Sequence, residues 1–440
     1  MLELADTVTG DNVHFRSKAD GIEHIFYASR TAKNDAQNEF KMRIPLDVTL
    51  ADGDYRLLFS LLDGTAIRRS LLVAVKDEMV HSIYGTEDGV KYDMDGDGPK
   101  DNPYLIESVT DYSRFMKGLR DDTEFHGLGT YFAQTVDLEG ISSSGSAMDK
   151  GYSSFSFAGN YDGQGHKIKI EYIGNNNTET DCYVGMFPNL IYGATVQNLD
   201  IECQIVNAAN YVGALAGTSS GMVTIDNVSA SGTIIAGSNV GGLIGASGQL
   251  GSSVSHRGTK TFLHITNSQN NCVLTCTGDY VGGFVGDSRY GLKAETVETN
   301  AAISGRNYVG GLVGSHNPES TSLSTDLLLY NVINNTSTGR TFSVNGASYV
   351  GGIAGYCLIS DFFQVHNAVL THTVDIVDSP KVIYGTSDYV GGLFGKLSIN
   401  SPLGMSISQC ATKAPVVGGK YTGGFAGYME IIGSGSLRLS

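Results

Sequence analysis

Two short patterns in this chain could take part in chemistry. Gly217-Thr-Ser-Ser-Gly221 has the spelling GxSxG, in which a serine nucleophile sits on a tight turn between a strand and a helix. Here the pattern lies in a connection rich in glycine and serine, without a helical pattern beside it, so we expect no nucleophile. His166 ends the turn Asp162-Gly-Gln-Gly-His166. A lone histidine supports no mechanism, and we interpret it as a turn or capping residue.

An acidic stretch could bind a divalent cation. Asp93, Asp95 and Asp97 alternate in the run DMDGDG, which matches the opening of a calcium-binding loop, and Asp101 stands at the ninth position. The twelfth position is Tyr104, where such a loop requires a bidentate glutamate. Weak calcium binding is therefore one interpretation, and a solvated turn is the favoured one. We expect no other cofactor.

The cysteines predict neither a metal site nor a disulfide framework. They occur at positions 182, 203, 272, 276, 357 and 410, without a CxxC pair or a histidine at zinc-finger spacing. We interpret them as small buried apolar side chains. Cysteine usage therefore leaves the cellular compartment open.

Charge excludes one class of partner. The chain carries 45 acidic and 29 basic residues, a net charge of −16, and such a surface repels nucleic acids and anionic lipids. We expect no nucleic-acid partner. The sequence has no apolar run of about 18 residues that could span a membrane and no secretory signal at its start. We expect any signal or anchor to lie outside it.

The elements that position these residues are repeats. Glycine supplies 57 residues and proline only 8, a composition that predicts an all-β chain with many tight turns. The run Tyr-Val-Gly-Gly-Leu-Val-Gly recurs, with variations, at positions 183, 211, 239, 280, 308, 349, 389 and 421. The tyrosines and paired glycines that define the repeat are Tyr211, Gly213, Gly241, Gly242, Tyr280, Gly282, Gly283, Tyr308, Gly310, Gly311, Tyr349, Gly351, Gly352, Tyr389, Gly391 and Gly392.

A second element lies between the copies. It is an apolar strand with a central asparagine, found at Asn198, Asn227, Asn267, Asn331 and Asn367. The basic unit of 28 residues is too short to bury its own apolar face, but stacked units can share one core. We therefore predict a parallel β-solenoid with a coil every ~4.8 Å and, from the preference of parallel crossovers, a right-handed wind.

Stacking also predicts columns of identical side chains. The valine and leucine of each copy should point inward, the asparagines should form a ladder of amide hydrogen bonds, and the tyrosines should stack along one side. Two interpretations of the tyrosines stay open. They form either a ladder that supports the coil, which we favour, or a stripe that binds a ligand.

The chain before the repeats has a different pattern. Residues 1–85 alternate in short apolar runs separated by turns, which predicts a β-sandwich-like module, and residues 86–102 form an acidic linker. Residues 103–182 should hold the solenoid's N-terminal cap and first coils, and residues 183–440 the repeats. Thr110 is the expected cap of a short helix that closes the first coil. Its apolar residues are Tyr112, Phe115, Met116 and Leu119.

The repeat resembles the GLUG motif of large bacterial surface proteins. The run Asn102-Pro-Tyr-Leu-Ile106, the strand Tyr131–Leu138 and the pattern FxGxxDGxGHxI from Phe157 to Ile168 are similar to the lead-in of such proteins, so the resemblance covers roughly residues 100–440. It implies a secreted or surface-anchored β-helical region of the kind found in gut Bacteroidetes, with a role in adhesion. The motif also occurs in immunoglobulin A-specific metallopeptidases, but their zinc-binding HExxH is absent from this sequence.

Two functions from different classes remain. We favour a non-catalytic secreted or cell-surface protein, an adhesin or scaffold that presents a solenoid surface to a host or environmental glycan or protein. Its candidate binding elements are the longer loops 246–262, 315–328 and 371–388. The alternative is a polysaccharide lyase or hydrolase of β-helix type, which needs acid and base groups on adjacent coils. The residues before the ladder asparagines form no such set: Gln197, Asp226, Thr266, Tyr330 and His366.

Overall fold

The structure is a computed structural model of residues 1–440. Of residues 1–87 it describes the backbone of seven strands. Beyond these it describes residues 92, 94–96, 98, 100–121, 126–142, 156–173, 182–191, 193–248, 262–318, 326–335, 342–360, 362–371, 383–400, 405–432 and 437–439. The chain divides into two compact units, Met1–Asp93 with Asp121–Gly129, and Met94–Arg120 with Thr130–Ser440. The boundaries predicted at residues 85, 102 and 182 stay predictions.

The first unit contains two antiparallel sheets. One sheet has the strand order β1-β2-β3-β4 and the other β5-β6-β7. Their strands are β1 (Glu3–Leu4), β2 (Asn12–Ser17), β3 (His24–Asn34), β4 (Glu39–Met42), β5 (Gly53–Phe59), β6 (Arg69–Lys76) and β7 (Met79–Glu87). The alternating apolar runs of residues 1–85 therefore form antiparallel strands, in contrast to everything that follows.

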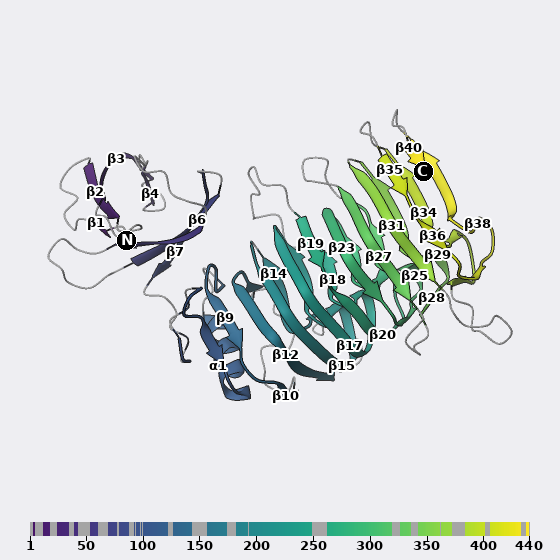
Figure 1. The fold of residues 1–440 in the computed structure, drawn as a ribbon, viewed down its shortest axis with the longest axis horizontal. Coiled ribbons are helices and arrows are strands. Elements are labelled where there is room, and N and C mark those ends of the chain that lie inside the picture. The colour runs from purple at the N-terminus through teal and green to yellow at the C-terminus, as the bar shows by residue number, and fades with distance from the viewer. Residues whose placement is uncertain are drawn as a thin grey trace. The chain divides into compact units, whose positions relative to one another are not determined.

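The second unit is a parallel β-solenoid (Figure 1). Its larger sheet has 24 strands. They are β8 (Tyr104–Ile106), β9 (Tyr131–Gln134), β10 (Leu138–Ser142), β12 (Asn160–Ile173), β13 (Cys182–Val184), β15 (Thr195–Gly213), β17 (Val223–Gly241), β19 (Phe262–Thr266), β20 (Gln269–Cys276), β21 (Val281–Gly282), β23 (Gly291–Thr299), β24 (Ala302–Ser304), β25 (Asn307–Gly310), β27 (Leu327–Asn335), β28 (Ser343–Gly346), β29 (Ser348–Gly351), β31 (Phe363–Thr371), β32 (Ile383–Gly385), β33 (Val390–Gly391), β35 (Met405–Ser408), β36 (Ala411–Thr412), β37 (Val416–Val417), β38 (Thr422–Gly423) and β40 (Leu437–Leu439).

A second sheet of nine strands closes the other side of each coil. It consists of β11 (Ser156–Phe157), β14 (Phe187–Ile191), β16 (Ala216–Ser220), β18 (Ile244–Ser247), β22 (Val285–Ser288), β26 (Val313–His316), β30 (Ala354–Ile359), β34 (Phe394–Ile399) and β39 (Ala426–Ile431). These strands pair in chain order, each parallel to the one before it. The predicted all-β class and the parallel solenoid are confirmed.

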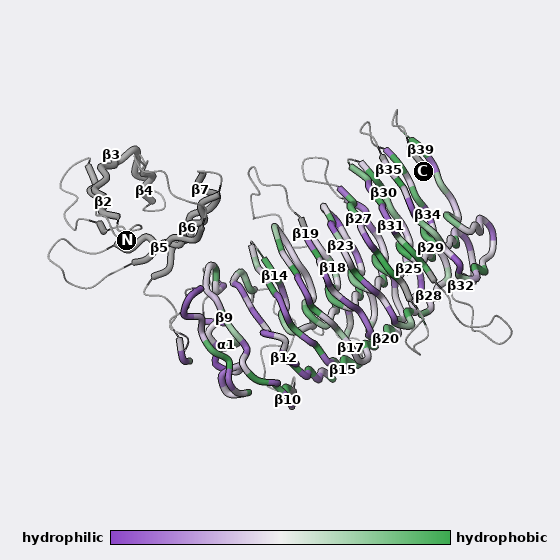
Figure 2. Tube along the Cα trace, in the orientation of Figure 1, coloured by the Kyte–Doolittle hydropathy of each residue, from purple (hydrophilic) through white to green (hydrophobic). Residues whose placement is uncertain are grey.

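The repeats lie in register across successive coils. Val212 pairs with Val240, and Val240 with Val281, so the motif copies occupy the same place on the coil. Some copies are 32, 40 or 41 residues apart instead of 28, and these differences do not shift the register. Figure 2 shows apolar residues interspersed with polar ones along the solenoid strands.

The motif's apolar residues fill the core, as predicted. In the first seven copies, the second-position valines and the fifth-position residues are each no more than 1% exposed. They are Val184, Val212, Val240, Val281, Val309, Val350 and Val390, and Phe187, Leu215, Leu243, Phe284, Leu312, Ile353 and Leu393. Identical side chains therefore stack along the axis in continuous apolar columns.

One helix, α1 (Val109–Asp121), covers the first coil. Phe115 is fully buried, and its ring centroid lies 4.6 Å from that of Phe132 on β9 and 6.1 Å from that of Phe187 on β14. The predicted cap at Thr110 is wrong, because Thr110 lies within the first turn. Ser108 caps the helix: its Oγ accepts the backbone N–H of Asp111 at 3.2 Å and donates to the Asp111 carboxylate at 2.6 Å.

Within the part of the chain that the structure describes, no helix combines the length and the apolarity needed to cross a membrane.

Glycine is required where the backbones of two coils meet. A Cβ on Gly283 would collide with the carbonyl oxygen of Gly311 in the following coil and would lie 2.9 Å from Thr299 Oγ1. Gly424 occupies the same motif position in the last copy, where a Cβ would have no atom within 4 Å. The second glycine of the pair therefore serves the stacking of coils. The first serves the local turn, since a Cβ on Gly282 would collide with the carbonyl oxygen of Val285 in the same copy.

This contrast gives a direct test. We expect Gly283→Ala to lower the free energy of unfolding of the solenoid by about 1–3 kcal/mol, because the added methyl group forces two backbones apart. We expect Gly424→Ala, the matched control, to leave it nearly unchanged. Chemical unfolding followed by circular dichroism measures both variants, and equal losses would show that coil contact is not the reason for the glycine.

Candidate functional site

The residues that could present chemistry lie at two corners of each coil. At both corners the backbone takes the left-handed conformation, with φ between 49° and 64°. One corner holds Tyr183, Tyr211, Asn239, Tyr280, Tyr308, Tyr349, Tyr389 and Tyr421, and the other holds Asn198, Asn227, Asn267, Thr296, Asn331, Asn367 and Gln409. Asparagine tolerates this conformation, whereas tyrosine rarely adopts it. The sequence motif alone gave no sign that its tyrosine is a left-handed residue.

Five of these tyrosines form a continuous stack, which we call the tyrosine ladder. Ring centroids lie 4.9 Å apart between Tyr280 and Tyr308, 4.6 Å between Tyr308 and Tyr349, 4.8 Å between Tyr349 and Tyr389, and 5.1 Å between Tyr389 and Tyr421. The planes of neighbouring rings differ by no more than 15°. The rings therefore cover one another's faces and present their edges to the side.

The column is interrupted at its third place. Tyr183 and Tyr211 stack at 5.0 Å, but Asn239 takes the next position, before Tyr280 resumes the column. Asn239 is 8% exposed, and its Oδ1 has no hydrogen-bond partner. The ladder of five is thus confined to the later coils.

The asparagines at the other corner hydrogen-bond from coil to coil. Asn227 Nδ2 donates to Asn198 Oδ1 at 2.9 Å, and Asn367 Nδ2 donates to Asn331 Oδ1 at 2.9 Å. These contacts tie neighbouring coils together along the axis. They also satisfy side-chain amides that would otherwise compete for the backbone.

Carboxylates share this corner, a feature that sequence reasoning missed. Asn198 Nδ2 donates to Asp162 Oδ1 at 3.0 Å, and Asn267 Nδ2 donates to Asp226 Oδ1 at 2.8 Å. Thr296 stands where the pattern leads one to expect an asparagine. The asparagine corner is therefore a mixed column of amides and carboxylates. The one sequence signal was Asp226, the residue directly before Asn227.

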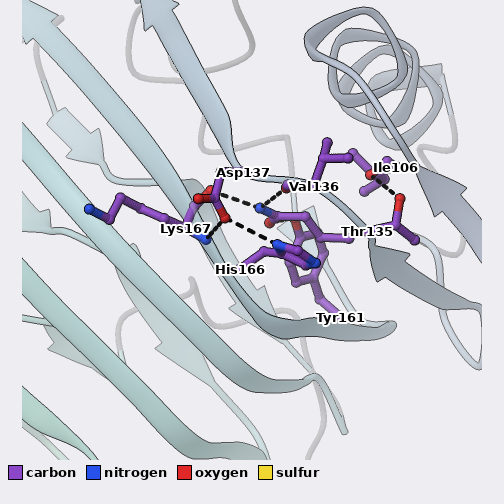
Figure 3. A network of polar contacts seen from close by, with 8 residues as sticks. Ile106, Thr135, Val136, Asp137, Tyr161, His166 and Lys167 are labelled. Carbon is purple, nitrogen blue, oxygen red and sulfur yellow. Dashed lines mark hydrogen bonds and ion pairs between the residues drawn. The ribbon is translucent and has the colours of Figure 1, made fainter.

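A polar network joins the first coils (Figure 3). Gln134 is fully buried: its Oε1 accepts from the Tyr161 hydroxyl at 2.7 Å, and its Nε2 donates to the carbonyl oxygens of Val136 at 2.8 Å and Lys167 at 2.9 Å. Such a fully paired buried amide specifies how the cap meets the first coil. Sequence reasoning missed Gln134, because its strand reads as an ordinary apolar run.

His166 and Asp137 lie at the exposed end of this network. The Asp137 carboxylate contacts His166 Nδ1 at 3.1 Å and accepts the backbone N–H of Lys167 at 2.9 Å. The Lys167 N–H, and then the hydrogen bond with His166, hold the pKa of Asp137 below its ordinary value. A carboxylate that orients an imidazole is half of a catalytic arrangement. Among the described residues, no hydroxyl or thiol bonds to His166 to complete it.

The GxSxG pattern lies within a strand and not on a turn. Ser219 belongs to β16 and is 0% exposed, as is its neighbour Thr218, whose hydroxyl donates to Asn189. A substrate could not reach the Ser219 hydroxyl in this structure. The nucleophile-elbow geometry is therefore absent at this position.

The predicted calcium residues are described only in part. Asp93 and Asp97 lie outside the described residues, while the backbone carbonyl of Asp95 accepts the N–H of Leu105 at 2.7 Å. The described residues contain no group of three or more histidine, cysteine, aspartate or glutamate side chains that could hold a metal ion. Calcium binding stays a prediction.

The cysteines are free thiols where the structure describes them. Cys203, Cys272, Cys276 and Cys357 are buried, and Cys410 is partly exposed. Burial raises the pKa of the Cys276 thiol to about 12. The Cys276 thiol is therefore protonated at neutral pH and unsuited to a nucleophilic or metal-binding role.

The three loops that we proposed as binding elements fall largely outside the described residues. Residues 249–261, 319–325 and 372–382, the central parts of loops 246–262, 315–328 and 371–388, are among those not described. Their role stays a prediction.

An ion pair beside the tyrosine ladder links two coils. Arg306 Nε and Nη2 donate to the two carboxylate oxygens of Asp279, each at 2.8 Å, and Asn307 adds its backbone N–H at 3.1 Å. These donors, Arg306 first, hold the pKa of Asp279 below its ordinary value. Asp279 and Asn307 precede Tyr280 and Tyr308, so the pair fixes the two rungs next to it.

Comparison with known proteins gives two similarities. Over 201 residues, 44% of this chain, the sequence is 30% identical to halomucin of Haloquadratum walsbyi, and the match spans 2% of that protein's length. Among solved structures, the chain is similar to a Bacteroides ovatus protein named as a "putative immunoglobulin A1 protease", with a TM-score of 0.36 and 16% identity over 78% of this chain and 79% of that one. That likeness assigns no activity. No protein-family model matches the chain, so the GLUG resemblance stays a prediction.

The Asp279 pair predicts a dependence of stability on pH. Because the folded state lowers the pKa of Asp279, its stabilising effect should be complete above the unfolded pKa of about 4 and should be lost as the pH falls through the folded value. We expect Asp279→Asn to be less stable than the wild type at pH 7 and equally stable at the acid end. Denaturant unfolding at a series of pH values measures this difference.

The matched variant is Arg306→Gln. It removes the Arg306 hydrogen bond, which is the largest cause of the lowered pKa of Asp279. We expect it to raise the pKa of Asp279, followed by NMR of the side-chain carboxyl, towards the ordinary aspartate value. A stability difference between wild type and Asp279→Asn that stays constant down to pH 2 would contradict the assignment.

Proposed function

We propose that this chain is part of a non-catalytic secreted or cell-surface protein of the GLUG-repeat kind, an adhesin or scaffold whose solenoid presents a long lateral surface to a glycan or a protein. The observation that carries the proposal is the strict register of the coils. It converts one residue per repeat into a column of equivalent side chains, of which the ladder Tyr280-Tyr308-Tyr349-Tyr389-Tyr421 is the longest aromatic case.

A register of this kind suits binding to extended partners. Each coil repeats the same groups about 4.8 Å further along the axis, so a polymer lying beside the stack meets the same chemistry many times. Weak single contacts then add up along the chain of the ligand. A stack held together by backbone contacts also keeps its surface groups in place before the ligand arrives, which lowers the entropic cost of binding.

The net charge of −16 supports a partner that is not a nucleic acid, because phosphate would be repelled. The similarity to a stretch of halomucin supports an extracellular or cell-surface location. The exposed Asp137–His166 pair belongs to the hydrogen-bonded cap in this proposal and not to an active site.

A binding and turnover screen tests the proposal. The full chain, immobilised through one terminus, is incubated with panels of host and plant glycans and of extracellular-matrix proteins. We expect retention of at least one class of ligand and no appearance of new reducing or unsaturated sugar ends. Release of such ends by the pure protein would favour the alternative, a polysaccharide lyase or hydrolase. His166→Ala is then the control that separates activity of this chain from a contaminant.

A further inference from the structure

A column of side chains on the outer face of the nine-stranded sheet stands apart from the repeat motif. Tyr356 on β30 pairs in register with Lys396 on β34, which pairs with Tyr428 on β39. All three are partly exposed, whereas their strand neighbours Cys357 and Leu397 are fully buried. The column therefore faces outward, with its two tyrosines separated by two coils, about 10 Å.

The two rings lie across the edges of the tyrosine ladder. Tyr356 contacts Tyr308 and Tyr349 at centroid distances of 6.1 and 6.0 Å, with interplanar angles of 66° and 76°. Since the ladder rings cover one another's faces, it is their edges that meet the Tyr356 ring. Because the Tyr356 ring contacts two successive tyrosines of the ladder, it lies along the solenoid axis.

Tyr428 repeats the arrangement two coils later. Its ring centroid lies 5.7 Å from that of Tyr389 and 5.4 Å from that of Tyr421, at interplanar angles of 78° and 70°. The column therefore carries two aromatic rings in equivalent settings, both aligned with the axis. We call Tyr356, Lys396 and Tyr428, together with Glu430, the tyrosine platform.

Lys396 lies between the two rings and forms an ion pair with Glu430, so that a hydrogen-bond donor and an acceptor are held beside the rings. Lys396 Nζ is 6.0 Å from the centroid of Tyr356 and 5.4 Å from that of Tyr428, and it pairs with Glu430 Oε1 at 2.9 Å. Ser398 Oγ donates to the same oxygen at 2.6 Å. The lysine retains N–H groups beyond the one used by Glu430. The local charges cancel, so the platform combines apolar faces with hydrogen-bonding groups and no net charge.

We propose that the tyrosine platform binds an uncharged, extended β-1,4-linked polysaccharide that lies along the solenoid axis. Sugar rings offer apolar C–H faces that rest on aromatic rings, and hydroxyls that bond to ammonium and carboxylate groups. In an extended β-1,4-linked chain every second sugar presents the same face, at nearly the separation of two coils. Sugars i and i+2 therefore rest on Tyr356 and Tyr428, and sugar i+1 lies beside Lys396. This inference rests on the proposed function and names its ligand class.

Calorimetric titration of the full chain with soluble hexasaccharides tests the assignment. We expect cellohexaose or xylohexaose to bind, and maltohexaose, an α-linked and curved chain, to bind at least tenfold more weakly. The variant Tyr356→Leu/Tyr428→Leu removes both flat faces while keeping apolar contact with the ladder, and we expect it to lose at least tenfold in affinity. Tyr330→Leu, a partly exposed tyrosine on β27 of the other sheet, is the matched control and should bind as the wild type does.

A second measurement uses the wild type alone, so it does not depend on how the variants fold. Tetranitromethane nitrates accessible tyrosines, and peptide mass spectrometry reads each site. We expect saturating cellohexaose or xylohexaose to protect Tyr356 and Tyr428 and to leave Tyr330 unprotected. Bound oligosaccharide without this protection would overturn the platform, as would equal affinity of the double leucine variant, or binding restricted to acidic oligosaccharides.

These outcomes separate the site from the broader function. If the wild type retains a ligand in the screen described above but binds no β-1,4-linked hexasaccharide, the platform assignment fails and the presenting role stands. If it retains no ligand in that screen and binds no hexasaccharide, both fail.

Discussion

Contact between the backbones of successive coils is the constraint on which the rest of the structure depends. Parallel strands bring each motif directly onto its neighbour, and at Gly283 the approach to Gly311 leaves no room for a side chain. This proximity sets the spacing of every column, apolar inside and polar or aromatic outside. A repeat on its own would lack this shelter, because its core valines, such as Val240, are buried by the coils on either side.

The left-handed backbone at the corners of each coil is energetically unfavourable. A left-handed backbone at a residue other than glycine costs on the order of 1–3 kcal/mol, and the chain adopts it at two corners per coil. Coil-to-coil contacts offset this cost: Tyr308 stacks between two rings, and Asn227 bonds to Asn198. The side chains at the corners are thus part of what holds the turn, which is why tyrosine and asparagine return at these positions in most repeats.

The sequence was informative where the repeat itself carries the information. The recurrence of one motif predicts stacked coils, buried valines and aligned tyrosines, because identical units in register must place identical residues in columns. Tyr356, Lys396 and Tyr428 each directly follow the last glycine of a motif copy, so the repeat alignment also places them in one column. The linear pattern could not predict the contacts that their side chains make with the tyrosine ladder, because the residue type at this position varies from copy to copy. The helix cap was misplaced for a related reason: Ser108 and Thr110 are both capping residues by type, and the hydrogen bond to Asp111 decides between them.

On the outer face of the nine-stranded sheet, the earlier and the later coils differ in the exposure of their side chains. In the earlier coils the column that continues to Tyr356 holds Thr218, Ala246, Asp287 and Ser315. Each of these side chains is no more than 3% exposed. In the later coils the same column holds Tyr356, Lys396 and Tyr428 of the tyrosine platform, which are partly exposed. The backbone register does not change between these regions, so side chains on this face can vary without disturbing the stack. A solenoid of this kind can therefore acquire a binding surface at some coils while the remaining coils supply length and rigidity, because the contacts that fold it lie inside and at the corners.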